Sequence, residues 1–181
     1  MSGKLTIENV YEIMQDKEDI EEILNSKVFS RQSNPNWILE KAAFVLLMID
    51  LRDLVWKSEH IAGKRIDFTD DIVPFRKVVD VTDLIAYVRD AAVHNTSGNS
   101  RVEQGKISFI VGIGKENIVQ IGELSLSCDY DDDICFVFGP ARIYLKRHII
   151  RAFIEAIDIL NPLIKEMQQK KPGFHPAHVV L

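Results

Sequence analysis

The segment that most constrains the fold is residues 35–60, a helical stretch whose middle is apolar on nearly every side. Asn34 and Pro35 supply an N-cap and a first helical residue. The longest apolar run, 42–49, is much shorter than the roughly 20 residues that a membrane-spanning helix needs, and Lys41 and Asp50 flank it. A helix that is apolar all round has to be buried by its neighbours. The sequence therefore predicts that this helix lies at the centre of a bundle.

Three further segments show helical periodicity, with apolar residues recurring three and four positions apart. They cover residues 5–25, which the polar stretch 16–19 can divide into two helices, then 81–95, and finally 141–168 with a kink at Pro162. Residues 64–80, with Pro74 and a mixed pattern, suit a short helix or an irregular connector. We therefore expect an up-and-down helical bundle of four to five helices.

The hydrophobic period changes between residues 106 and 138, where β-branched and aromatic residues partly alternate with polar ones. The pattern predicts strands over 106–113, 118–128 and 134–138. In the middle strand the apolar residues change from odd positions, Val119 and Ile121, to even positions, Leu124 and Leu126. We therefore expect a β-bulge at Gly122. The expected fold class is mainly α, with an inserted three-stranded antiparallel β meander at about 106–138. Residues 1–169 would form a single domain, and 170–181 a flexible C-terminal tail.

Charge and cysteine usage restrict the partners and the compartment. The net charge of −5 means that the whole molecule does not attract nucleic acid, so any RNA contact needs a local basic patch. Cys128 and Cys135 lie in apolar runs without metal-binding spacing, which predicts buried free thiols in a reducing compartment. The N-terminal residues have no apolar stretch typical of a secretion signal. We expect a cytoplasmic protein with no membrane partner.

One polar cluster at the end of the helix 81–95 can carry chemistry: Arg89, Asp90, His94 and Asn95. On a helical wheel Asp90 and His94 share one face, while Arg89 lies about 140° away from His94. Arg89 and His94 therefore do not meet within one straight helix. They can converge if the helix ends at or before His94, or if two copies face each other across a two-fold axis.

Such a pair suits RNA cleavage without a metal ion. An imidazole can move the proton of a ribose 2′-hydroxyl, and a guanidinium can hold the scissile phosphate. Asp90 can orient either group. The alternative is structural: Asp90 and His94 as a surface pair, Arg89 covering the edge of the core with its aliphatic stem, and His94 with Asn95 as polar residues at the helix end.

The run Arg89 to His94, followed by Asn95, resembles the signature of the HEPN superfamily, in which an arginine and a polar residue precede a histidine. This resemblance implies a homodimeric, metal-independent endoribonuclease of toxin or phage-defence type, with RNA as substrate and no cofactor. It makes Arg89 and His94 catalytic and Asp90 a supporting residue. An antitoxin or another protein partner would fit a toxin. The superfamily also contains non-catalytic modules that bind proteins or nucleotides, which is the alternative function.

A basic segment at the start of the last predicted helix is a second candidate. Arg142, Lys146 and Arg147 can contact RNA phosphates beside the cleft, together with Asn95. The alternative is that they offset the acidic loop 129–133. No metal-binding motif is apparent in the sequence, and the resemblance implies none.

Overall fold

The computed structural model describes residues 4–30, 36–94, 98–102 and 105–170. Its helices are α1 (Ile7–Asn25), α2 (Trp37–His60), α3 (Val81–Val93) and α4 (Arg151–Lys170). Helix α2 packs against each of the other three, and its residues Phe44, Leu47, Met48, Leu51 and Leu54 are fully buried. Helix α2 is therefore the central helix, as predicted, but it is not buried on every side, because Leu39, Leu46 and Ile49 are exposed. No helix in the described ranges has the length and apolarity to cross a bilayer.

Two helices differ in detail from the sequence-based expectation. Helix α1 is continuous, and the capping box between Thr6 and Asn9 marks its start. Helix α2 begins after Asn36, whose side chain accepts the N–H groups of Ile38 and Leu39. The N-cap predicted at Asn34 lies outside the described residues. The segment predicted at 64–80 as a short helix or an irregular connector is a connector, and it spans residues 61–80 between α2 and α3.

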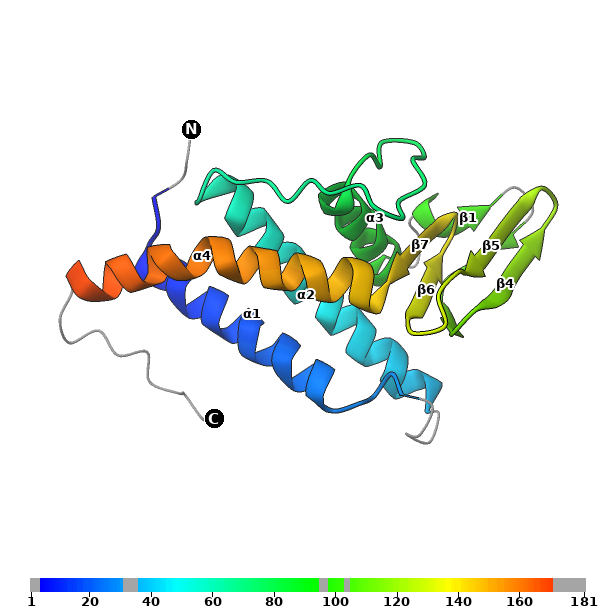
Figure 1. Cartoon of the computed structure of the whole chain (residues 1–181), viewed down its shortest axis with the longest axis horizontal. Helices are drawn as coiled ribbons and strands as arrows, with labels where there is room; N and C mark the ends of the chain where they lie inside the picture. Colours follow the sequence, from blue (N-terminus) through cyan, green and yellow to red (C-terminus); the bar gives the residue numbers. More distant parts are fainter. Residues whose placement is uncertain (1–3, 31–35, 95–97, 103–104, 171–181) are drawn as a thin grey trace.

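The predicted bundle with one meander is wrong, because the strands form three small antiparallel sheets gathered at one end of the molecule (Figure 1). Strand β1 (Arg101–Val102) pairs with β2 (Gly105–Lys106). The central sheet has the order β3-β6-β7, from Ile110–Ile113, Ile134–Phe138 and Ala141–Tyr144. Strands β4 (Glu116–Ile121) and β5 (Leu124–Cys128) form a separate hairpin.

The conformation of Gly122 explains why the predicted middle strand is wrong. The predicted middle strand 118–128 is two strands, because Gly122 has φ +57° and opens a two-residue turn between Ile121 and Leu124. A glycine with positive φ at the first turn position is typical of tight hairpins. The change of the apolar residues from odd to even positions therefore marks the point at which the chain reverses direction. The bulge lies instead between Asn117 and Val119.

The last predicted helix also begins later than expected. Residues 141–144 form β7, which pairs with β6 after a turn at Gly139, where φ is +54°. A π-helical segment, η2 (Leu145–Ile150), then leads into α4. The buried carboxylate of Asp133 accepts the backbone N–H groups of Lys146 and Arg147. The side chain of Asp133, which lies in the loop before β6, thus caps the start of η2. The hydrophobic periodicity of the sequence does not indicate such a contact.

The central sheet belongs to the same core as the helices. The ring of Phe44 on α2 lies 4.3 Å from that of Phe136 and 5.3 Å from that of Phe138, both on β6. A second buried cluster lies farther out and includes Cys128 and Cys135. Both are free thiols, as predicted, and burial raises the pKa of each. The β segment is therefore packed into the domain through its central sheet.

Candidate functional site

Helix α3 carries the predicted catalytic cluster at its C-terminal end. The carboxylate of Asp80 accepts the N–H of Asp83 and begins the helix, and Leu84, Ile85 and Val88 bury one face. The α conformation ends at Val93. His94 is the C-cap and has left the helical region, with ψ of 96°. The helix therefore ends before His94, which is one of the two conditions under which Arg89 and His94 can converge.

Asp90 contacts both predicted catalytic residues. Its side chain lies 3.0 Å from Nη1 of Arg89, and its backbone oxygen accepts the N–H of His94 at 3.1 Å. The Asp90 side chain is exposed, and so is His94. Asp90 thus links the arginine and the start of the non-helical segment. Asn95 lies outside the described residues.

Arg89 is held at the edge of the core with its guanidinium partly in solvent. Its side chain is 32% exposed, while its Nε atom is buried and has no hydrogen-bond partner among the described residues. A buried donor without a partner costs free energy unless another group satisfies it. The guanidinium therefore retains hydrogen-bonding capacity beyond its contact with Asp90.

The basic segment is largely engaged with the acidic loop. Arg142 donates to the carbonyl of Ser127 and to Asp129, at 2.6 and 2.7 Å. A hydrogen bond from Ser127, aided by Arg142, lowers the pKa of Asp129. These contacts hold Arg142, whose side chain is only 14% exposed, against the strands.

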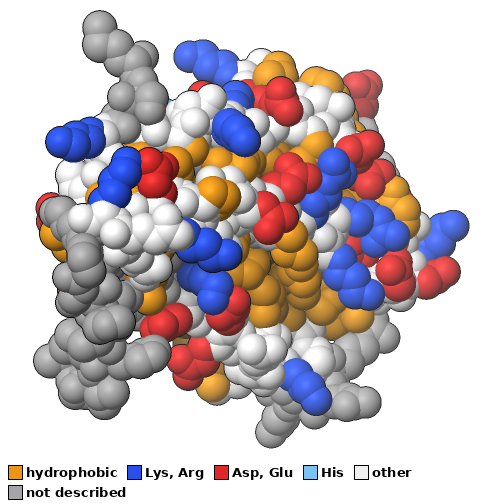
Figure 2. Space-filling view, turned by 60° about the vertical axis from the view of Figure 1, so that its left-hand side comes forward, with side chains coloured by type: hydrophobic (Ala, Val, Ile, Leu, Met, Phe, Trp, Pro, Cys, Tyr) orange, Lys and Arg blue, Asp and Glu red, His pale blue; other side chains and the backbone are white. Residues whose placement is uncertain are grey.

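Arg147 and Lys146 also pair with this loop. The Arg147 guanidinium bonds to Asp132 and Asp133 and lies 3.5 Å from the ring centroid of Tyr130. Lys146 lies 3.5 Å from Asp132 and is the most exposed of the three cations. This arrangement matches the alternative in which the basic residues offset the acidic loop. Figure 2 shows one face of the molecule, on which Lys and Arg side chains lie interspersed with Asp and Glu around an apolar area.

A buried charged cluster between α1 and α2 escaped the sequence analysis. Lys57 is 1% exposed and contacts Glu12, Asp16 and Asp53. Asp50 lies two turns before Lys57 on α2 and is buried, with one carboxylate oxygen unpartnered among the described residues. The only local signal was the spacing of Asp53 and Lys57, four residues apart. The partners from α1 required the tertiary structure.

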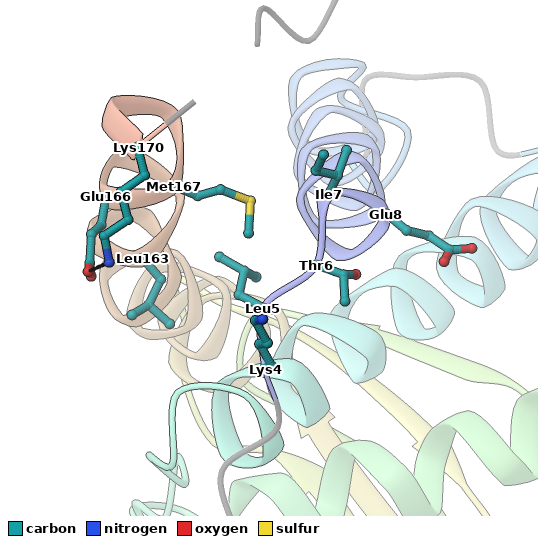
Figure 3. Close-up of a pocket in the computed structure, with 9 residues that line it drawn as sticks. All are labelled: Lys4, Leu5, Thr6, Ile7, Glu8, Leu163, Glu166, Met167 and Lys170. Carbon is teal, nitrogen blue, oxygen red and sulfur yellow. Dashed lines mark hydrogen bonds and ion pairs between the residues drawn. The ribbon is translucent and has the colours of Figure 1, made fainter. Parts of the chain in front are cut away.

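A cavity of about 710 Å³ lies between the start of α1 and the end of α4 (Figure 3). Leu5, Leu163 and Met167 give it an apolar wall. The charged groups at its rim include Glu166 and Lys170, which pair with each other. Among the described residues that line it there is no histidine, cysteine or arginine. The cluster on α3 therefore remains the better candidate for chemistry.

Comparisons with known proteins leave the assignment to the residues themselves. No family model, no curated protein and no solved structure matches this chain.

Proposed function

We propose that this protein is a metal-independent endoribonuclease of HEPN type that acts in the cytoplasm as a homodimer. The observation that carries the proposal is the end of α3 at Val93. This end frees His94 from the helical wheel that would separate it from Arg89. The Asp90 carboxylate contacts the Arg89 guanidinium, and the Asp90 backbone oxygen accepts the last helical hydrogen bond, from the N–H of His94.

The proposed reaction uses the RNA's own 2′-hydroxyl as nucleophile. Its oxygen attacks the adjacent phosphorus, the bond to the 5′-oxygen breaks, and the products are a 2′,3′-cyclic phosphate and a 5′-hydroxyl. The exposed imidazole of His94 would transfer the proton. Arg89 would stabilise the charge on the phosphoryl oxygens. Asp90 would hold the Arg89 guanidinium in place, as its 3.0 Å contact suggests.

An exposed apolar line along α2 supports the homodimer. Leu39, Ala42, Leu46 and Ile49 follow the alternating three- and four-residue spacing of a coiled-coil seam. Trp56 lies seven residues beyond Ile49, with Asp53 at the position between them, and all five apolar residues are exposed. The two ends of this line are prominent, since Leu39 is 59% and Trp56 39% exposed. Exposed apolar side chains gathered in one row are typical of an interaction site. A second copy offers the same spacing, so α2 can pair with α2 across a two-fold axis.

Cleavage of a labelled RNA in the presence of a chelator tests the proposal. We expect the wild-type protein to release fragments with cyclic phosphate ends. Arg89→Ala and His94→Ala should each lower the rate at least about 100-fold, the scale of general acid–base and electrostatic contributions. Arg151→Ala is a control on α4, because it removes an exposed arginine that lies outside both the cluster and the apolar line on α2.

Two results would argue against the proposal. One is wild-type cleavage that survives both α3 substitutions while circular dichroism shows folded variants. The other is activity that disappears with the chelator and returns with a divalent metal ion. Expression in bacterial cells tests the toxin or phage-defence role, since the wild type should arrest growth and His94→Ala should not. A neutralising antitoxin would relieve that arrest.

A further inference from the structure

A groove lies beside the β4–β5 hairpin, between this hairpin, β1 and the connector that precedes α3. It encloses about 520 Å³ and is lined by Phe75, Arg76, Arg101, Val102, Ile121, Leu124 and Pro140. We call it the hairpin groove. A smaller pocket of about 300 Å³ adjoins it and shares Phe75, Leu124 and Pro140. The groove is therefore one end of a longer depression.

The hairpin groove carries two arginines and no acidic residue among the described residues that line it. Arg76 and Arg101 are both exposed, and neither forms an ion pair within the described ranges. Arg142 and Arg147, in contrast, are bound to carboxylates. A guanidinium without a carboxylate partner presents donors in the geometry that suits a phosphate group.

The conformation of Arg76 is unusual and is held from α3. Arg76 has φ +50°, a left-handed conformation that L-residues rarely adopt. It lies in a tight turn closed by mutual backbone hydrogen bonds between Phe75 and Val78. Its guanidinium donates to the Tyr87 hydroxyl at 3.1 Å, and that hydroxyl donates to the carbonyl of Asn99. Strain of this kind persists where the surroundings enforce it, often at functional sites.

The rest of the groove suits the face of a nucleobase. Phe75, Val102, Ile121 and Leu124 are half-buried and give it an apolar floor. Phe75 also packs edge-on against Tyr87, with ring centroids 4.9 Å apart. Stacking of bases on such surfaces is tolerant of sequence.

The groove is connected to the candidate catalytic cluster through α3. Tyr87, which holds Arg76, lies six residues before Val93, or roughly 9 Å along the helix axis from the point where α3 ends and the segment with His94 begins. A single strand covers that distance in a few nucleotides.

We propose that the hairpin groove binds single-stranded RNA a few nucleotides from the scissile phosphate, with Arg76 and Arg101 contacting backbone phosphates. The choice of RNA as ligand rests on the proposed function. The contact is confined to the arginine end, because Asp71 and Glu123 line the adjoining pocket and would repel phosphate.

Anisotropy of a short, fluorescein-labelled 2′-O-methyl RNA tests this on the full chain, because the probe has no free 2′-hydroxyl and cannot be cleaved. Arg76→Gln with Arg101→Gln should weaken binding about tenfold. It should also reduce the slope of log K against log salt concentration by about 1.4, for two phosphates on a single strand. The matched control, Lys64→Gln with Lys165→Gln, removes two exposed charges outside the groove and should change neither quantity. Arg76→Lys with Arg101→Lys keeps the charge and should retain most of the slope.

An equal loss of RNA affinity in the groove and control variants would overturn the proposal, and so would unchanged RNA affinity in the groove variant. Absence of binding by the wild type, or preference for an acidic peptide over the RNA, would overturn it too. The two proposals fail separately. A protein that binds through the groove but cleaves no RNA refutes the nuclease alone. A protein that cleaves through Arg89 and His94 but binds independently of Arg76 and Arg101 refutes the groove alone.

Discussion

The ammonium nitrogen of Lys57 lies 3.3 Å from a carboxylate oxygen of Asp16, and this contact joins α2 to α1. Glu12 and Asp53 approach the same ammonium, which is almost fully buried. Burial and a hydrogen bond shared with Asp53 raise the pKa of Asp16 to about 7, despite the opposing effect of Lys57. The interface between these helices therefore depends on one cation among several carboxylates.

Removal of that cation should strongly destabilise the fold. Lys57→Met leaves Asp16 without its positive partner, and we expect the free energy of unfolding to fall by about 3–5 kcal/mol. Urea denaturation measures it. Lys17→Met is the matched control, because the exposed pair between Lys17 and Glu21 contributes less than about 1 kcal/mol. A similar loss in both variants would show that the buried cluster has no special role.

Stability should decrease as the pH rises from about 4 to about 7. Burial raises the pKa of Asp50 to about 6, with further contributions from Asp19 and Asp53, and Asp16 reaches about 7. Both carboxyls bind protons more tightly in the folded state than in the unfolded state, where the value is 3.8. The folded state thus loses its advantage as these protons dissociate.

Asp50→Asn tests this pH dependence. The variant removes a buried charge, so at pH 8 its free energy of unfolding should exceed that of the wild type by about 1–3 kcal/mol. Thermal unfolding should show this as a higher midpoint temperature. The difference should shrink at pH 5. Asp158→Asn changes an exposed carboxylate and should leave the pH profile unaltered. An Asp50→Asn profile parallel to the wild type would contradict the prediction.

Asp133→Asn should weaken the junction between the strands and α4. Asp133 is buried and accepts backbone N–H groups from Ile134, Lys146 and Arg147, as well as the Arg147 guanidinium. Loss of these charge-assisted hydrogen bonds should cost about 2–3 kcal/mol, measured by thermal unfolding. Asp131→Asn, on the exposed part of the same loop, is the control. Equal effects would mean that the charge of the loop matters more than the cap.

Gly139→Ala should disturb the contact between β6–β7 and the segment that follows α3. An added Cβ would lie 2.1 Å from the backbone oxygen of Asn99, and φ is +54°. We expect destabilisation of about 1–3 kcal/mol by urea denaturation. Gly98→Ala is the control, because a Cβ there meets no atom within 4 Å.

Ile49→Glu tests the apolar line on α2. A charge at its centre should convert a dimer into a monomer in light scattering and remove RNA cleavage with it, because a buried, unpaired carboxylate opposes association. Ile154→Glu alters an exposed apolar residue of α4 and should leave both unchanged. A dimer that survives Ile49→Glu would place the subunit interface elsewhere.

Periodicity predicted the helical parts of the fold well. The apolar stripe of Leu84, Ile85 and Val88 placed α3, and the run around Phe44 placed the central helix, because both patterns depend on local geometry alone. Strand partners were predicted poorly. The hairpin at Gly122 and the pairing of β6 with β7 depend on contacts that hydrophobic alternation does not encode.

The sequence by itself determined the candidate residues for chemistry, since the side-chain types of Arg89, Asp90 and His94 and their spacing along the chain are local properties. Only the tertiary structure decided which charges are free. It engages Arg142 and Arg147 with the acidic loop and leaves Arg76 and Arg101 at an open groove. The physical reason is that an ion pair depends on distance in space, and segments far apart in the chain set that distance only after the core has packed.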